Sequence, residues 1–170
     1  MKPKIILFII ALVLSTSAYS LDNQFGSFIS PKGWKIIDKK LLPGNVKCLV
    51  QGRTLNDVPP SLNLAVENCT SSLENYLKSA KSIFVSKGDS WQQLGTIKTR
   101  SGPAALVLIT QDSPFGQVRL MQAFIQQNNV IYLLTATALK EEFNKYYSDF
   151  FKAFQSFSLP ETFLSDPEEF

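Results

Sequence analysis

Apolar and polar residues alternate along several short stretches of this chain, which is the pattern of strands that bury one face. In residues 62–67 (LNLAVE), Leu62, Leu64 and Val66 fall on one side of a strand and the residues between them on the other. Turn residues separate such stretches, as in residues 30–33 (SPKG), where proline fixes φ and glycine permits positive φ. The pattern predicts strands over residues 25–29, 34–37, 46–51, 62–67, 91–98, 104–110, 117–126 and 130–136.

Two other stretches have the spacing of amphipathic helices. Residues 72–86 follow Ser71, a suitable N-cap, with Glu74 three residues later as its partner in a capping box, and Gly88 ends the pattern. Residues 139–156 form the second predicted helix. Its apolar face is expected to consist of aromatic residues: Phe143, Tyr146, Tyr147, Phe150, Phe154 and Phe157.

The links between the predicted strands indicate the fold class. Residues 128–129 (NN) form a two-residue link that tolerates positive φ, and short links of this kind make neighbouring strands antiparallel. Residues 104–110 (AALVLIT) are apolar on both faces, which predicts a central strand covered on both sides. The order of four strands, a helix, four strands and a helix predicts an α+β fold, an antiparallel β-sheet flanked by helices.

The N-terminus has the layout of a secretory signal peptide. Lys2 and Lys4 form a basic head, residues 5–14 are apolar, and small residues at Ala18 and Ser20 suit cleavage after Ser20. The apolar run is shorter than the ~20 residues that cross a bilayer, which favours cleavage over the alternative of an uncleaved anchor. No cysteine lies at the cleavage point, so a lipoprotein route has no residue to modify.

Three segments follow from this layout: a signal peptide over residues 1–20, a single domain over 21–158, and an acidic, flexible tail over 159–170. We expect a periplasmic or secreted protein that has no stable membrane span after cleavage. Seventeen basic and 14 acidic residues give a net charge of +3, and loss of Lys2 and Lys4 leaves 15 against 14. A nearly neutral chain argues against nucleic acid as the partner, and we expect a monomer.

The chemistry of the side chains argues against an enzyme. The chain contains no histidine, which excludes Ser-His and Cys-His activation and removes the commonest transition-metal ligand. We therefore expect no catalytic residue, no cofactor and no metal site. Adjacent acids at 141–142 and 168–169 leave a hydrolase with a carboxylate pair as a third hypothesis. Cys48 and Cys69 are the two cysteines, and either one disulfide or two buried thiols fits them.

Partner contacts are expected on turns that present fixed side chains. Asp57, Val58, Pro59 and Pro60 belong to a proline-stiffened loop, and residues 112–116 (DSPFG) put Pro114 and Phe115 at a hairpin tip. Stiffening by proline lowers the entropy lost on binding, although ordinary turns are the alternative. Trp34 could stack on a ligand or close the end of a core, and the aromatic helix face could line a pocket or fill the core.

With this order of elements the chain resembles the PsbP-like/Mog1/DcrB-like superfamily over about residues 25–158. The resemblance implies an α/β/α sandwich and a mainly non-enzymatic role in binding or assisting another protein. It rests on residues 31–34 (PKGW), 62–66 (LNLAV), 102–104 (GPA), Arg119, Gln122, 132–137 (YLLTAT) and 156–157 (SF).

The leading hypothesis is therefore an exported, non-enzymatic interaction or assembly factor with an unidentified protein partner in the cell envelope. The alternative is a carrier of a small apolar ligand or lipid in a cleft between sheet and helices, which needs a pocket of about 300 Å³ or more.

Overall fold

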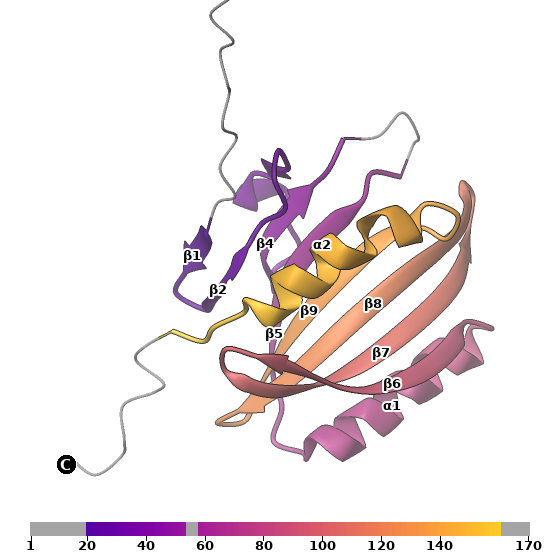
Figure 1. The fold of residues 1–170 in the computed structure, drawn as a ribbon. Coiled ribbons are helices and arrows are strands. Elements are labelled where there is room, and N and C mark those ends of the chain that lie inside the picture. Colours follow the sequence, from indigo (N-terminus) through magenta and orange to yellow (C-terminus); the bar gives the residue numbers. More distant parts are fainter. Residues whose placement is uncertain (1–19, 54–57, 161–170) are drawn as a thin grey trace, which may run out of the picture.

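The fold is an antiparallel sheet between two helices, and the computed structural model describes residues 20–53 and 58–160 (Figure 1). Seven strands form the sheet in the order β3-β4-β5-β9-β8-β7-β6, and β1 and β2 form a separate pair. The elements in chain order are β1 (Ser20–Asn23), β2 (Gly26–Ile29), β3 (Lys35–Ile36), the short 3-10 helix η1 (Lys39–Leu41), β4 (Val46–Gln51), β5 (Ser61–Asn68), α1 (Leu73–Ser86), β6 (Ser90–Thr99), β7 (Gly102–Ser113), β8 (Gly116–Gln127), β9 (Val130–Leu139) and α2 (Phe143–Gln155).

Helices α1 and α2 pack on opposite faces of the sheet, which confirms the predicted α+β sandwich. Every pairing of neighbouring strands is antiparallel. The N-terminal part differs from the prediction in two respects. Ser20–Asn23 adds a strand that was not expected, and the strand expected over residues 34–37 shortens to Lys35–Ile36. No helix in residues 20–53 and 58–160 is long and apolar enough to cross a membrane.

Strand β7 is an interior strand with both faces covered, as its apolar sequence predicts. Leu106 is buried on the face that α2 covers, and Val107 is buried on the face that α1 covers. The middle position in the seven-stranded sheet is nevertheless occupied by β9, which pairs with β5 on one side and with β8 on the other. The link after β8 has the expected left-handed backbone, with φ of 48° at Asn128 and 58° at Asn129.

Helix α2 seals the larger of the two cores. Phe143, Phe150 and Phe154 are almost fully inaccessible to solvent, and Phe157 continues the same face after the helix ends. The helix begins at Phe143 rather than at residue 139, because residues up to Leu139 extend β9. Tyr147 was expected on the apolar face but is 43% exposed, because that face is centred on Phe150.

Helix α1 packs less deeply than α2. None of its residues is buried, and Leu73, Tyr76, Leu77 and Phe84 are only half-buried against the sheet. Its N-cap is Ser72, whose Oγ accepts from the backbone N–H of Asn75 at 3.3 Å, so the expectation of Ser71 was wrong by one residue.

The two cysteines are free thiols, so the disulfide alternative is wrong. In the β4–β5 hairpin Cys48 lies opposite Leu64, and Cys69 comes five positions after Leu64. At ~3.4 Å per residue the cysteines are about 17 Å apart, whereas a disulfide requires about 4.4–6.8 Å between Cα atoms. An odd number of steps also places Cys69 on the opposite face of the sheet. The hairpin therefore keeps the two thiols too far apart for a disulfide.

Candidate functional site

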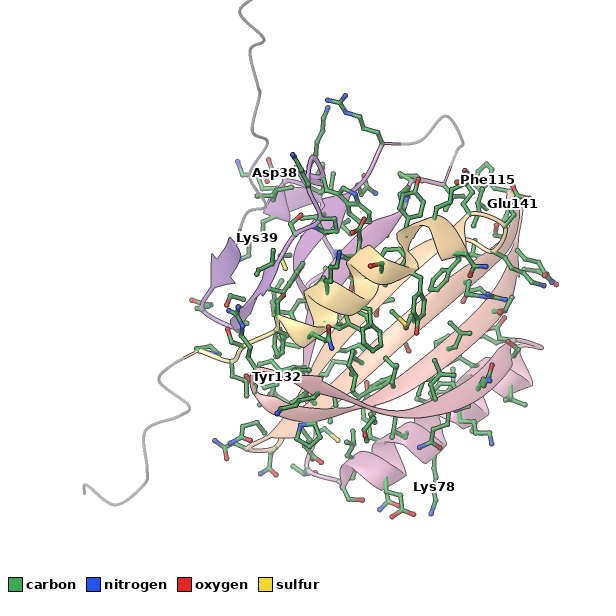
Figure 2. All side chains as sticks on the ribbon, in the orientation of Figure 1. Asp38, Lys39, Lys78, Phe115, Tyr132 and Glu141 are labelled. Atoms are coloured by element: carbon green, nitrogen blue, oxygen red, sulfur yellow. The ribbon has the colours of Figure 1, made fainter. Side chains whose placement is uncertain are left out.

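Several loops from distant parts of the sequence meet at one end of the sheet. The register pairs Ser61 with Thr137, Val118 with Leu139, and Ser90 with Thr110, so the strands concerned begin or end together. We call this region the loop end, and Figure 2 shows Phe115 and Glu141 there. It consists of residues 58–60, 87–89, 113–116 and 140–142.

The end of the proline-stiffened loop, residues 58–60, belongs to the loop end and directly precedes β5. Asp57 lies outside the described residues. Val58 and Pro59 are half-buried, while Pro60 is buried and its carbonyl accepts from the N–H of Gly52 at 2.8 Å. Pro60 therefore acts as part of the fold, and the partner contact predicted for Val58 and Pro59 stays a prediction.

Trp34 lies beside Gly52, where it packs against the core under α2. Its ring makes edge-on contacts with Tyr146 and Phe150, at centroid distances of 6.1 and 5.9 Å. A side chain on Gly52 would come within 2.9 Å of the indole ring and 2.8 Å of Pro60, so a glycine is required there for this packing.

Phe115 stands at the tip of the β7–β8 hairpin and is 58% exposed, as the sequence predicts for its position. Local hydrogen bonds hold the tip. The Ser113 hydroxyl donates to the carbonyl of Gly116 at 2.6 Å and accepts from the N–H of Phe115 at 3.2 Å. Gly116 has φ of 107°, a conformation that L side chains rarely adopt. The tip thus presents an aromatic ring from an ordered turn.

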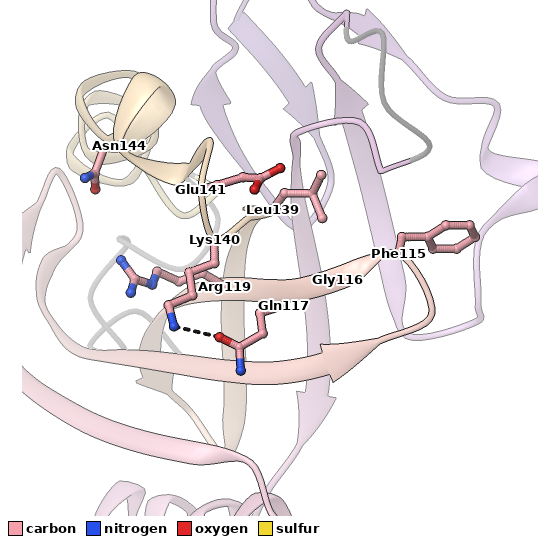
Figure 3. A pocket seen from close by; sticks show the side chains of 8 residues that line it. All are labelled: Phe115, Gly116, Gln117, Arg119, Leu139, Lys140, Glu141 and Asn144. Atoms are coloured by element: carbon pink, nitrogen blue, oxygen red, sulfur yellow. Dashed lines mark hydrogen bonds between the residues drawn. The ribbon is translucent and has the colours of Figure 1, made fainter.

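A pocket of about 540 Å³ opens beside this tip (Figure 3). The start of β8, the end of β9 and the first turn of α2 form its walls. It is lined by Phe115, Gly116, Gln117, Arg119, Leu139, Lys140, Glu141 and Asn144. In Figure 3 the guanidinium of Arg119 and the ammonium of Lys140 extend to the same side of the pocket, and the ring of Phe115 points the opposite way.

A chain of side-chain hydrogen bonds fixes the polar wall of this pocket. Lys140 Nζ donates to Gln117 Oε1 at 2.6 Å, and Gln117 Nε2 donates to Asp112 Oδ1 at 3.0 Å. Arg119 takes no part in this chain. Its guanidinium lies 5.7 Å from the ring centroid of Phe143, and its Nε is shielded from solvent without a hydrogen-bond partner.

Sequence reasoning did not identify this pocket. Arg119 entered only through the family resemblance, and Gln117, Lys140 and Asn144 were not considered. One signal was present, because Arg119 shares its strand face with Met121 and Ala123, which are buried under α2. A cation on the core-facing side of a strand is unusual enough to mark a site.

Solved structures with the same architecture identify the fold. PsbP from the cyanobacterium Synechocystis aligns with a TM-score of 0.59 and 12% identity, over 85% of this chain and 92% of PsbP. The Ran-binding protein Mog1p of Saccharomyces cerevisiae aligns with a TM-score of 0.53 and 12% identity, over 84% of this chain and 96% of Mog1p. The chain has the PsbP/Mog1-like fold.

LpqN, which is involved in cell envelope biogenesis of Mycobacterium tuberculosis, has the PsbP/Mog1-like fold as well. It aligns with a TM-score of 0.55 and 12% identity, over 78% of this chain and 82% of LpqN. By sequence, this chain matches no family profile and no curated protein. The likeness therefore extends to the fold, and the function must be argued from the residues of this chain.

The PsbP/Mog1-like fold leaves little room for an apolar ligand under α2 in this chain. Phe143, Phe150, Phe154, Phe157 and Tyr132 fill the space between α2 and the sheet. A second hollow, of about 360 Å³, lies between α1 and the edge strand β6 and is lined by Glu74, Leu77, Lys78, Lys81, Trp91 and Gln93. Its charged rim and open position do not fit the closed apolar cleft that a lipid carrier uses.

Cys48 and Tyr76 have raised pKa values that keep them uncharged at neutral pH. Burial raises the pKa of the Cys48 thiol to about 11, so this thiol is protonated at neutral pH and is a poor nucleophile. Burial, together with a hydrogen bond to Glu67, raises the pKa of Tyr76 above its ordinary value. In the part of the chain that the structure describes, no three acidic or cysteine residues gather where they could hold a metal ion.

Proposed function

We propose that this protein is an exported, non-enzymatic interaction or assembly factor, monomeric by itself, that holds a protein partner in the cell envelope with its loop end. The observation that carries the proposal is Phe115, an aromatic ring 58% exposed on a hydrogen-bonded hairpin tip beside a pocket of about 540 Å³. Exposed aromatic side chains on ordered turns are typical binding hot spots, because little entropy is lost when they are buried.

Charge and fold support this proposal. A nearly neutral chain gains little from long-range attraction, so affinity must come from a few anchors at the contact surface. Of the solved proteins with this fold, Mog1p is Ran-binding and LpqN is involved in cell envelope biogenesis. Export rests on the basic head and apolar run of residues 2–14. N-terminal sequencing of the native protein tests it, because retention of Lys2 would contradict cleavage after Ser20.

Site-specific photo-crosslinking in the native cell tests the interaction. A photoreactive phenylalanine at position 115 should give a discrete adduct with one protein. The matched control is position 29, because Ile29 is also an exposed apolar residue, at 38%, but lies beside Ser156, at the other end of α2 from the loop end. Equal labelling at both positions, or no adduct at position 115, would contradict the proposed use of the loop end.

A further inference from the structure

Among the described residues, the guanidinium of Arg119 has a ring contact with Phe143 but no hydrogen bond or ion pair, which is unusual for a group partly enclosed by protein. Its Nε is shielded from water and makes no hydrogen bond, and the ion pairs of the described residues involve other cations, Lys78 and Lys145. The groups beside it do not compensate. Across the sheet its strand neighbours are Thr110 and Ala138, neither of which carries a charge.

Lys140 adds a second cation to the same side of the pocket. One of its N–H groups donates to Gln117, so two donors stay available on the ammonium. Asp112, which lies beside these cations, accepts a hydrogen bond from the amide of Gln117 at 3.0 Å. Figure 3 shows the carboxylate of Glu141 turned to the side of Leu139, away from the two cations. The wall therefore presents two cations that have no carboxylate partner among the described residues.

We propose that Arg119 and Lys140 bind a carboxylate from an acidic segment of the partner protein, while an apolar side chain of the same segment packs on Phe115. This inference rests on the proposed interaction function. Guanidinium groups bind carboxylates through two parallel hydrogen bonds, and the ring of Phe143, 5.7 Å from the guanidinium of Arg119, supports this group on one side.

The charge balance around the pocket favours a carboxylate over a phosphate group. Arg119 and Lys140 supply two positive charges, and Asp112 and Glu141 place two negative charges nearby. Because these charges balance, the pocket lacks the excess of positive charge that would favour a doubly charged phosphate, while the planar fork of Arg119 matches a carboxylate. The lining of the pocket includes one glycine, Gly116, which lies in a hairpin turn and not in a glycine-rich loop of the kind that phosphate sites use.

The test is a titration of isotope-labelled protein followed by NMR, with two short peptides that have blocked ends. One peptide has the sequence leucine, aspartate, leucine, and the other has asparagine in place of aspartate. The aspartate peptide should shift the signals of Gln117, Lys140 and Phe115 and bind about tenfold more tightly than the asparagine peptide, a difference of about 1.4 kcal/mol. Equal binding of the two peptides would refute the proposal.

Peptide binding by single-residue variants tests whether the charge of Arg119, and not substitution in general, determines the affinity. Arg119→Gln should weaken the aspartate peptide about tenfold, and Arg119→Lys should restore part of the loss because the charge remains without the planar fork. Lys140→Gln should weaken binding less. The matched control is Arg100→Gln, in the β6–β7 turn at the opposite end of the sheet, which should bind like wild type. Melting temperatures show that each variant is folded. A loss no larger for Arg119→Gln than for Arg100→Gln would overturn the assignment.

Two further experiments distinguish failure of the carboxylate site from failure of the interaction function. Inorganic phosphate should compete with the peptide no better than acetate at equal ionic strength, and much stronger competition by phosphate would replace the carboxylate site by a phosphate site. Crosslinking from position 115 is then repeated in the Arg119→Gln background and should decrease. An unchanged adduct together with equal peptide binding leaves the interaction function standing and rejects the carboxylate. Absence of the adduct in wild type rejects the interaction function even if the aspartate peptide binds.

Discussion

Phe150 is one of the buried aromatic residues that attach α2 to the sheet, so Phe150→Ala should strongly destabilise the domain. It is 0% exposed and contacts Phe143, Tyr146 and Trp34, with ring centroids 5.3, 6.1 and 5.9 Å away. Replacement of a buried phenylalanine by alanine costs about 3–5 kcal/mol, as lost burial plus the cavity that remains. For a domain of this size the melting temperature should fall by about 10 °C.

Urea unfolding followed by circular dichroism measures this loss. The midpoint should fall while the dependence on urea stays the same, because the variant exposes a similar surface on unfolding. The control is Phe115→Ala, the same substitution at a ring that is 58% exposed, which should lower the free energy of unfolding by less than about 1 kcal/mol. Benzene should restore part of the stability of Phe150→Ala, because apolar cavities bind it.

A loss below about 1 kcal/mol for Phe150→Ala, or one equal to that of Phe115→Ala, would refute the reasoning. It would mean that α2 is only loosely attached and that the space beneath it can open. The carrier hypothesis would then regain a place for its ligand, because the aromatic residues that fill this space would be easily displaced.

Two other outcomes follow from the pKa shifts and the separated thiols. Without reductant, iodoacetamide should modify Cys69 first and Cys48 only on unfolding, because Cys48 is buried with a pKa of about 11. Mass spectrometry counts the additions, and no addition even to the unfolded chain would indicate a disulfide. The raised pKa of Tyr76 contributes stability that is present below pH ~10 and lost above it, because the unfolded chain then releases the proton more readily. Tyr76→Phe should therefore show a smaller loss of unfolding free energy between pH 8 and pH 11 than wild type, and an equal loss would contradict the role of Tyr76.

The sequence by itself determined the local elements, because their causes lie within a few residues. The Asn128–Asn129 turn required left-handed backbone at two neighbouring positions, and both residues adopt it. The spacing of Phe143, Phe150 and Phe154 specified one buried face of α2. The placement of Phe115 at an exposed tip followed from the proline and glycine on either side of it.

The tertiary structure decided what these elements bring together. Pairing of β5 with β9 joins the two halves of the chain and carries residues 58–60 to the same end of the sheet as Phe115. No local pattern specifies such a pairing, since it depends on how all the strands share the buried faces. Strand register also keeps Cys48 away from Cys69, because it determines the distance between the two residues and the face of the sheet on which each lies. Arg119 illustrates this difference. Its place on the core-facing side of its strand can be read from the sequence, but whether its Nε has a hydrogen-bond partner depends on the residues that pack around it.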